Sequence, residues 1–218
     1  MKRTAFITLC FAALAFALGS WLTLDFSVWT AEGARRLRVL QGPVNAPAMD
    51  VMSAAQGAQS LAALLADGRH VTVVTFFYAR CPSICLSMGN TLQQMQTALQ
   101  NPPPPFNLRR PVRLLSLSFD PAHDGLTTLR AYSLQMRADP ALWQFATPVN
   151  ATALRTLLSR WGVVVIADGK GGFEHNAALL VVNPQGQLMR IFDDTDSEAA
   201  LAYAHHLAGN GGKGGEEG

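Results

Sequence analysis

The pattern of apolar and polar positions predicts that strands and helices alternate from about residue 71. Residues 71–78 (VTVVTFFY) form an apolar, β-branched and aromatic run, which is typical of a strand buried on both faces. We expect a second buried strand over 112–119. Between the two, residues 84–99 carry apolar side chains every three or four positions, which predicts a helix with one buried face. The proline run at 102–105 either stops this helix or docks a partner, and we favour the stop. A second helix is expected over 126–136.

The second half of the chain predicts two more helices, a short strand and a β-hairpin. The helices are expected over 152–161 and 197–208, and the short strand over 163–166. The turn tetrapeptide Asn-Pro-Gln-Gly separates strand-like segments at 177–182 and 187–192, which predicts a hairpin. The resulting order β-α-β-α-β-β-α predicts an α/β, thioredoxin-like domain, with a central mixed sheet and helices on both faces.

The N-terminal segment is uncharged and apolar. Sixteen of the twenty residues over 5–24 are apolar, and a helix of that length spans about 30 Å, the thickness of the hydrocarbon core of a bilayer. A cleaved signal peptide is the alternative, because Ala17-Leu18-Gly19 offers small residues for cleavage. We favour a retained transmembrane helix over 1–24, followed by a stalk over 25–46. Either reading exports the domain, so we expect a single-pass protein of a bacterial-type inner membrane with its domain in the periplasm.

The distribution of charge argues against a nucleic-acid-binding protein. The chain has 17 basic and 15 acidic residues, and Lys2 and Arg3 supply two of the basic ones, so the balance is even from Asp25 onward. A domain that binds nucleic acid needs a surplus of basic residues to neutralise phosphates. The folded domain is expected over 47–208, and the glycine-rich residues 209–218 are expected to form a disordered tail.

Two cysteines stand where the first buried strand meets the first long helix. Apart from Cys10 in the apolar segment, Cys81 and Cys85 are the only cysteines, so they form no disulfide framework. Pro82 suits the first helical position, which places Cys81 at a helix N-terminus, where the dipole favours a thiolate. The four-residue spacing brings both sulfurs to one side of the first turn. Two buried, inert cysteines are the other interpretation, which the position at a strand end disfavours.

One histidine and one aspartate are candidates to complete a site at this end of the sheet. His175 follows a glycine-rich turn, and we expect it to open the central strand of the hairpin. Taken alone, a histidine there is more often a satisfied polar residue than a ligand. Asp120 ends the neighbouring strand at the same sheet edge as Cys81. It is either a turn-forming residue before Pro121, or a group that supports the ligands from behind or faces a partner.

Three sequence blocks in order resemble the Sco/SenC family of copper chaperones. They are TFFYARCPSIC (75–85), LSLSFDPAHD (115–124) and EHNAALLVVNPQGQLMR (174–190), and the resemblance covers about 47–208. It implies a thioredoxin-like fold. It also implies that copper is delivered to the binuclear site of cytochrome c oxidase.

The resemblance further implies which residues hold the metal. Members of the family bind copper with the two cysteines of C-x-x-x-C and one later histidine, which correspond here to Cys81, Cys85 and His175. This chain departs from the family at Leu86, where proline usually follows the second cysteine. We expect altered local geometry there rather than lost ligands.

The implied donor set suits copper. Two thiolates and an imidazole form a soft set for Cu(I), and the imidazole also accommodates Cu(II). Three ligands leave a position open for a partner's ligand, whereas a structural zinc site would want four. We therefore predict a membrane-tethered metallochaperone, rather than an enzyme, that binds one copper ion. Its expected partner is a copper-accepting oxidase subunit or another exported copper protein.

A thiol-disulfide oxidoreductase is the alternative function, and some members of the family are similar to such reductases. Cys81 would then be the attacking thiolate and Cys85 the resolving thiol. Thioredoxin-like reductases normally place a cis-proline opposite the cysteines, just before the hairpin strand. Here Glu174-His175-Asn176 occupies that region without a proline, which favours the metal site.

Overall fold

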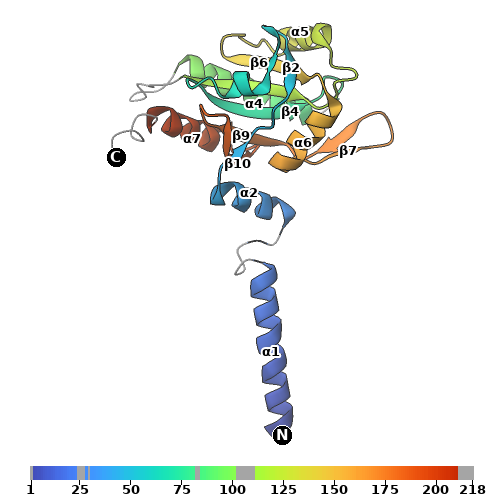
Figure 1. Ribbon diagram of the computed structural model, residues 1–218, viewed down its shortest axis with the longest axis vertical. Helices are drawn as coiled ribbons and strands as arrows, with labels where there is room; N and C mark the ends of the chain where they lie inside the picture. Colours follow the sequence, from blue (N-terminus) through green and yellow to red (C-terminus); the bar gives the residue numbers. More distant parts are fainter. Residues whose placement is uncertain (1, 24–27, 29, 82–83, 102–110, 211–218) are drawn as a thin grey trace. The chain divides into compact units, whose positions relative to one another are not determined.

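The computed structural model describes residues 2–23, 28, 30–81, 84–101 and 111–210 (Figure 1). The chain divides into two compact units, Met1–Gln41 and Gly42–Gly218, and each is described by itself. The proline run at 102–105 and residues 211–218 of the expected tail lie outside the described residues.

The first unit contains helices α1 (Lys2–Leu22) and α2 (Ala31–Gln41). Among the residues that the structure describes, no helix is long and apolar enough to cross a membrane, so the expected transmembrane helix is not found. Part of the segment expected to be an irregular stalk is helical. In α2 the carboxylate of Glu32 accepts hydrogen bonds from the guanidinium groups of Arg35 and Arg36. Pairs at this spacing stabilise a helix that has few apolar residues.

The second unit is built on an eight-stranded sheet, and the prediction of a central mixed sheet is confirmed. Its strand order is β1-β10-β9-β4-β5-β6-β2-β3. β4, β5 and β6 run parallel to one another, and the remaining neighbours pair antiparallel. The strands are β1 (Val44–Asn45), β2 (Asp50–Ser53), β3 (Gly57–Ser60), β4 (Val71–Phe77), β5 (Val112–Ser118), β6 (Trp143–Pro148), β9 (Ala178–Val182) and β10 (Gln187–Asp193).

Helices cover both faces of this sheet. They are α3 (Leu61–Leu65), α4 (Ile84–Gln100), α5 (Leu126–Gln135), α6 (Ala151–Trp161) and α7 (Ser197–Asn210). On one face the rings of Phe77 and Tyr132 of α5 stack with centroids 5.0 Å apart. On the other, Phe76 meets Trp161 of α6 edge to face at 6.2 Å. Because consecutive strand residues point to opposite faces, β4 is buried on both, and all seven of its residues are buried.

A separate two-stranded sheet precedes the hairpin and corrects the expected place of His175. β7 (Val165–Ala167) and β8 (Phe173–His175) pair antiparallel, and Figure 1 shows their connection extending from the domain. His175 therefore ends β8 instead of opening the hairpin strand. The expectation was wrong because Asn176 and Ala177 interrupt the strand that the apolar pattern suggested.

The β9–β10 hairpin is confirmed, and its turn shows why the sequence places glycine there. The Asn183 side-chain oxygen accepts hydrogen bonds from the backbone N–H groups of Gln185 and Gln187, each at 3.0 Å. Gly186 has a φ of +77°, and a Cβ there would lie 3.0 Å from the Cβ of Ala66. A larger residue would be strained both by its backbone and by this close approach.

Candidate metal centre

The carboxyl ends of β4 and β5 define the edge of the sheet at which the candidate site lies. The two strands are parallel, so the segments that follow them emerge side by side. The backbone N–H of Phe119 donates to the carbonyl of Phe77 at 3.0 Å, and that of Cys81 donates to the carbonyl of Tyr78 at 3.2 Å. Cys81 and Asp120 therefore follow adjacent parallel strands at the same edge of the sheet.

The two cysteines lie around the start of α4. Cys81 precedes the first residue of α4, Ile84, and its side chain is partly exposed. Cys85 is the second residue of the helix, and its side chain lies outside the described residues. No acidic residue occurs in the first turn of α4, so nothing in that turn opposes a thiolate by like charge.

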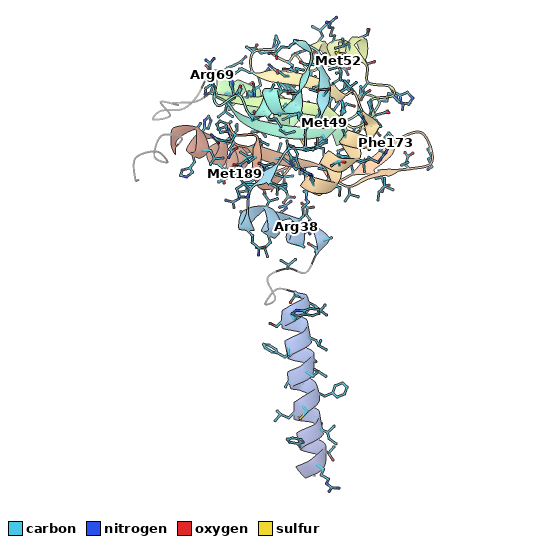
Figure 2. All side chains as sticks on the ribbon, viewed as in Figure 1. Arg38, Met49, Met52, Arg69, Phe173 and Met189 are labelled. Carbon is cyan, nitrogen blue, oxygen red and sulfur yellow. The ribbon has the colours of Figure 1, made fainter. Side chains whose placement is uncertain are left out.

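An aromatic cluster brings His175 to the same edge. We define this cluster as Tyr78, Phe119, Phe173 and His175. The Phe119 ring lies 5.3 Å from that of Tyr78, 5.5 Å from that of Phe173 and 5.0 Å from the imidazole of His175. Phe173, labelled in Figure 2, comes from β8. The cluster thus holds the β7–β8 sheet against the ends of β4 and β5.

Hydrogen bonds add to the ring contacts. The Tyr78 hydroxyl accepts from the backbone N–H of Phe173 at 3.3 Å and lies 3.5 Å from its carbonyl oxygen. Because Tyr78 stands three residues before Cys81, the same residue supports both the histidine strand and the cysteine loop. His175 and Cys81 are coupled in this way through Tyr78 and Phe119.

The His175 imidazole is held in the form that binds metals. Burial lowers its pKa below the usual value of 6.5, and this outweighs the opposing effects of the Asn176 backbone and the Asp194 carboxylate. A histidine with a lowered pKa is neutral at pH 7, and the neutral imidazole is the metal-ligating form.

Asp120 is buried and faces the residue next to Cys81. Its carboxylate accepts a hydrogen bond from the Arg80 guanidinium at 3.0 Å and lies 2.9 Å from Nδ1 of His123. Its backbone N–H donates to the Ser118 hydroxyl at 3.0 Å. Asp120 is therefore placed to fix the loop that carries Cys81 through the side chain of Arg80.

Asp124 is a second buried carboxylate at this edge that the sequence reasoning missed. It accepts hydrogen bonds from the Ser118 hydroxyl at 2.6 Å and from the backbone N–H of Ala79 at 3.0 Å. Burial raises its pKa above the usual value, against the lowering effect of these bonds. Its position in the sequence could have indicated this role, because Asp124 lies only four residues after Asp120. One short turn can direct both carboxylates toward the loop that carries Cys81.

One of the three predicted ligands, Cys85, has its side chain outside the described residues. Among the described side chains, no group of three His, Cys, Asp or Glu residues could hold a metal ion. The side chain of Cys85 is not one of them, so the set of Cys81, Cys85 and His175 stays a prediction.

Comparison with known proteins identifies the family. The family model SCO1/SenC matches residues 56–207, which is more than half of the chain. The chain belongs to the SCO1/SenC family. No curated protein matches the chain.

Solved structures similar to this SCO1/SenC chain share its fold. A SCO1/SenC family lipoprotein from Bacillus anthracis is 17% identical, with a TM-score of 0.65, over 78% of this chain and 99% of that one. Yeast Sco1, solved with copper bound, is 16% identical, with a TM-score of 0.60, over 76% and 89%. BsSco, described as a cytochrome c oxidase assembly protein with a disulfide switch, is 18% identical, with a TM-score of 0.63, over 76% and 94%. At these identities the likeness shows the α/β, thioredoxin-like fold.

Proposed function

We propose that this protein is a copper metallochaperone that binds one copper ion through Cys81, Cys85 and His175. It delivers the ion to the binuclear copper site of cytochrome c oxidase. The observation that carries the proposal is the aromatic cluster, which holds a neutral His175 at the sheet edge from which Cys81 emerges. Family membership and the copper-bound structure of yeast Sco1 support it.

The donor set explains how such a protein would take up and release its cargo. Two thiolates and an imidazole suit Cu(I), and three ligands leave room for a ligand of the acceptor to enter before a chaperone ligand departs. Loading requires both thiols to be reduced and deprotonated, so copper binding releases protons. His175 needs no deprotonation at pH 7, because burial has already lowered its pKa.

Asp120 acts as a positioning residue in this proposal. Its carboxylate holds Arg80, which directly precedes Cys81. The bond joins a buried carboxylate to an exposed guanidinium, so it orders the loop, in which Cys81 is itself partly exposed. Of the roles that the sequence suggests for Asp120, the proposal takes the one that supports the ligands from behind.

A transfer experiment tests delivery. The reduced chain is loaded with Cu(I) and mixed with a metal-free oxidase subunit that carries the binuclear site, in the presence of a chelator that removes released copper. Copper is then measured in each protein after separation. We expect copper on the acceptor only when the loaded chaperone is present. If the acceptor gains no more copper from the loaded chaperone than from the copper–chelator complex alone, the proposal is contradicted.

We also propose that residues 1–24 direct the domain to the periplasmic side of a bacterial-type inner membrane and tether it there. The uncharged run over 5–24 and the exposed apolar side chains of α1, such as Phe6, Leu9 and Phe11, support export. Protease added to spheroplasts should digest the domain in the membrane fraction. Protection from the protease would contradict export, and a mature chain that begins near residue 20 would contradict the tether.

A thiol-disulfide oxidoreductase is the second candidate, and the disulfide switch described for BsSco favours it. In this chain, Cys81 would attack a partner's disulfide and Cys85 would resolve the mixed disulfide. His175→Ala separates the two functions, because a reductase has no need of the imidazole. Protein-disulfide reduction that persists in this variant and exceeds that of free dithiol would favour the reductase.

A further inference from the structure

A polar cavity of about 370 Å³ lies at the opposite end of the sheet from Cys81. It adjoins the beginnings of β4 and β5, because His70 directly precedes β4 and Arg113 is the second residue of β5. Figure 2 labels Arg69 and Phe173, which lie at the two opposite sides of the domain. The cavity is lined by residues that include Gln59, Asp67, His70, Arg113, Pro140 and Gln144.

The main polar side chains of this cavity lie on one face of the sheet. Gln144 pairs with Leu115, and Arg113 is two residues before Leu115, so Arg113 and Gln144 share a face. The Arg113 guanidinium donates to the backbone carbonyl of Leu64, which shows that α3 covers this face.

Gln59 belongs to the same face. It pairs with Val51, which in turn pairs with Pro148 of β6. Pro148 is four residues after Gln144, and side chains an even number of residues apart share a face. The cavity is therefore a polar site built into one face of the sheet.

The charged groups of the cavity are satisfied by one another. The Asp67 carboxylate accepts hydrogen bonds from the backbone N–H groups of Arg69 and His70, each at 2.9 Å. It also contacts Nδ1 of His70 and lies 3.2 Å from Nη1 of Arg113. Partial burial raises the pKa of Asp67, but these contacts together lower it to about 2. Asp67 is thus ionised, and its charge cancels that of Arg113.

Two amide groups of the cavity have unmet hydrogen-bonding capacity. The Oε1 atom of Gln144 and the Nε2 atom of Gln59 are buried and have no hydrogen-bond partner in the part of the chain that the structure describes. Gln144 as a whole is 9% exposed. Buried polar groups are nearly always paired, and leaving one unpaired costs stability. The Oε1 atom of Gln144 needs a hydrogen-bond donor, and the Nε2 atom of Gln59 needs an acceptor.

We propose that this cavity binds an amide group. An amide carbonyl accepts from Nε2 of Gln59 and an amide N–H donates to Oε1 of Gln144, so one neutral group meets both needs. An anion offers Gln144 no donor, and a cation offers Gln59 no acceptor. Because the charges of Asp67 and Arg113 cancel, the cavity has no net charge to attract either ion. The volume is that of a small-molecule site, which suits a small carboxamide or one residue of a peptide chain.

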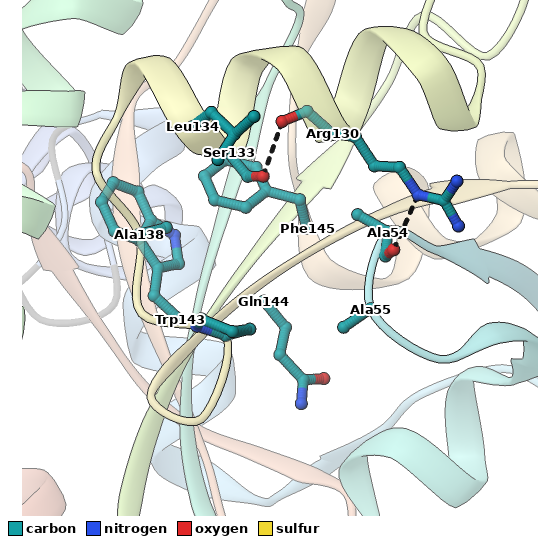
Figure 3. A pocket seen from close by; sticks show the side chains of 10 residues that line it. Ala54, Ala55, Arg130, Ser133, Leu134, Ala138, Trp143, Gln144 and Phe145 are labelled. Carbon is teal, nitrogen blue, oxygen red and sulfur yellow. Dashed lines mark hydrogen bonds between the residues drawn. The ribbon is translucent and has the colours of Figure 1, made fainter.

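A smaller neighbouring cavity supports the placement of Gln144. It has a volume of about 140 Å³ and shares Pro140 and Gln144 with the larger one. Figure 3 shows its lining, in which the amide end of Gln144 extends away from the ring of Phe145. Gln144 thus stands between the two cavities, where its amide can serve a ligand in the larger one.

Nuclear magnetic resonance of the full-length, copper-free chain labelled with ¹⁵N tests the proposal. Acetamide and N-acetylglycine-N-methylamide are the probes, and acetate is the charged control. We expect saturable shifts of the Gln59 and Gln144 side-chain N–H signals with amides, at millimolar affinity, and none with acetate. Tighter binding of the peptide amide identifies a protein chain as the source, and equal binding identifies a small carboxamide.

Matched variants make the test specific to these two residues. We expect Gln144→Met and Gln59→Met each to weaken amide binding about tenfold, whereas Gln185→Met, at an exposed turn, leaves it unchanged. Either variant suffices if the other fails to fold. No saturable shift at concentrations on the order of 100 mM, or equal binding in the folded variants, would overturn the proposal and leave a cavity that holds only water. Copper binding has no part in either result.

Discussion

At the scale of single residues, two buried carboxylates secure the loop before Cys81. Asp120 acts through the Arg80 side chain, and Asp124 acts through the backbone of Ala79. Both come from one turn after β5, where Asp124 N–H donates to the Asp120 carbonyl at 2.9 Å. The loop is therefore fixed by groups that do not themselves need to touch the metal.

Replacing Asp124 tests this arrangement. Asp124→Asn keeps the size of the side chain, but its amide cannot accept from both Ser118 and Ala79 as well as a carboxylate does. We expect a loss of about 1–3 kcal/mol in the free energy of unfolding, measured by urea denaturation. Asp50→Asn, at an exposed position of β2, should change it little. Equal stability of the two variants would contradict this role.

Buried histidines make the stability of the fold depend on pH. Burial lowers the pKa of His205 on α7 below 6.5, so the unfolded chain binds a proton more readily than the folded one. This contribution to stability is present above about pH 6.5 and is lost as the pH falls toward the lowered folded pKa. His175 acts in the same direction.

Urea denaturation at pH 7.5 and 5.5 measures this effect. We expect the wild-type chain to lose stability between these values, by at most about 1.4 kcal/mol per pH unit for each histidine. His205→Gln should reduce the loss, and the exposed His206→Gln should not. The raised pKa of Asp124 has the opposite sign, but every protein compared carries Asp124. A loss that is unchanged in His205→Gln would show that burial of this histidine is not responsible.

At the scale of elements, the β7–β8 sheet is what places His175. Its connection to the domain runs through the rings of Phe119 and Phe173 and the hydroxyl of Tyr78. Gly172 allows a close approach there, because a Cβ would meet Oδ2 of Asp168 at 2.6 Å and the Tyr78 hydroxyl at 3.2 Å.

Removing the Tyr78 hydroxyl should loosen this sheet. We expect Tyr78→Phe to cost about 1 kcal/mol of stability and to weaken Cu(I) binding several-fold, since His175 would lose part of its support. Tyr203→Phe, whose ring packs on Phe192 at 5.8 Å, serves as the control. Copper affinity that is the same in both variants would show that the hydroxyl does not position His175.

Elements were predictable where the apolar pattern was strong. β4 is a run of seven buried residues and α4 has a regular apolar spacing, and both lie within a residue or two of the expected bounds. β6 was missed because its six residues include Gln144, Thr147 and a final proline, which do not resemble a buried strand. The short β2 and β3 gave no periodic signal. α2 was not predicted because ion pairs, rather than regularly spaced apolar residues, support it.

At the scale of the whole molecule, the sheet of the second unit carries different chemistry at its two ends. The end that follows β4 and β5 carries Cys81 and His175. The end that precedes these strands carries the polar cavity lined by Arg113. The sequence indicated the first end because cysteine and histidine carry a recognisable chemistry. It gave no sign of the second, because Gln59, Arg113 and Gln144 are distant in sequence and meet only through the register of the sheet.

The proposed function depends on Cys81, Cys85 and His175 holding copper together. The most direct measurement is an anaerobic titration of the reduced full-length chain with Cu(I), in competition with a chelator of known affinity. We predict one copper ion per chain, bound at least about tenfold more weakly in His175→Ala and equally well in His206→Ala. If the wild-type chain binds no copper, or His175→Ala binds it as tightly as the wild type, these three residues do not form the copper site.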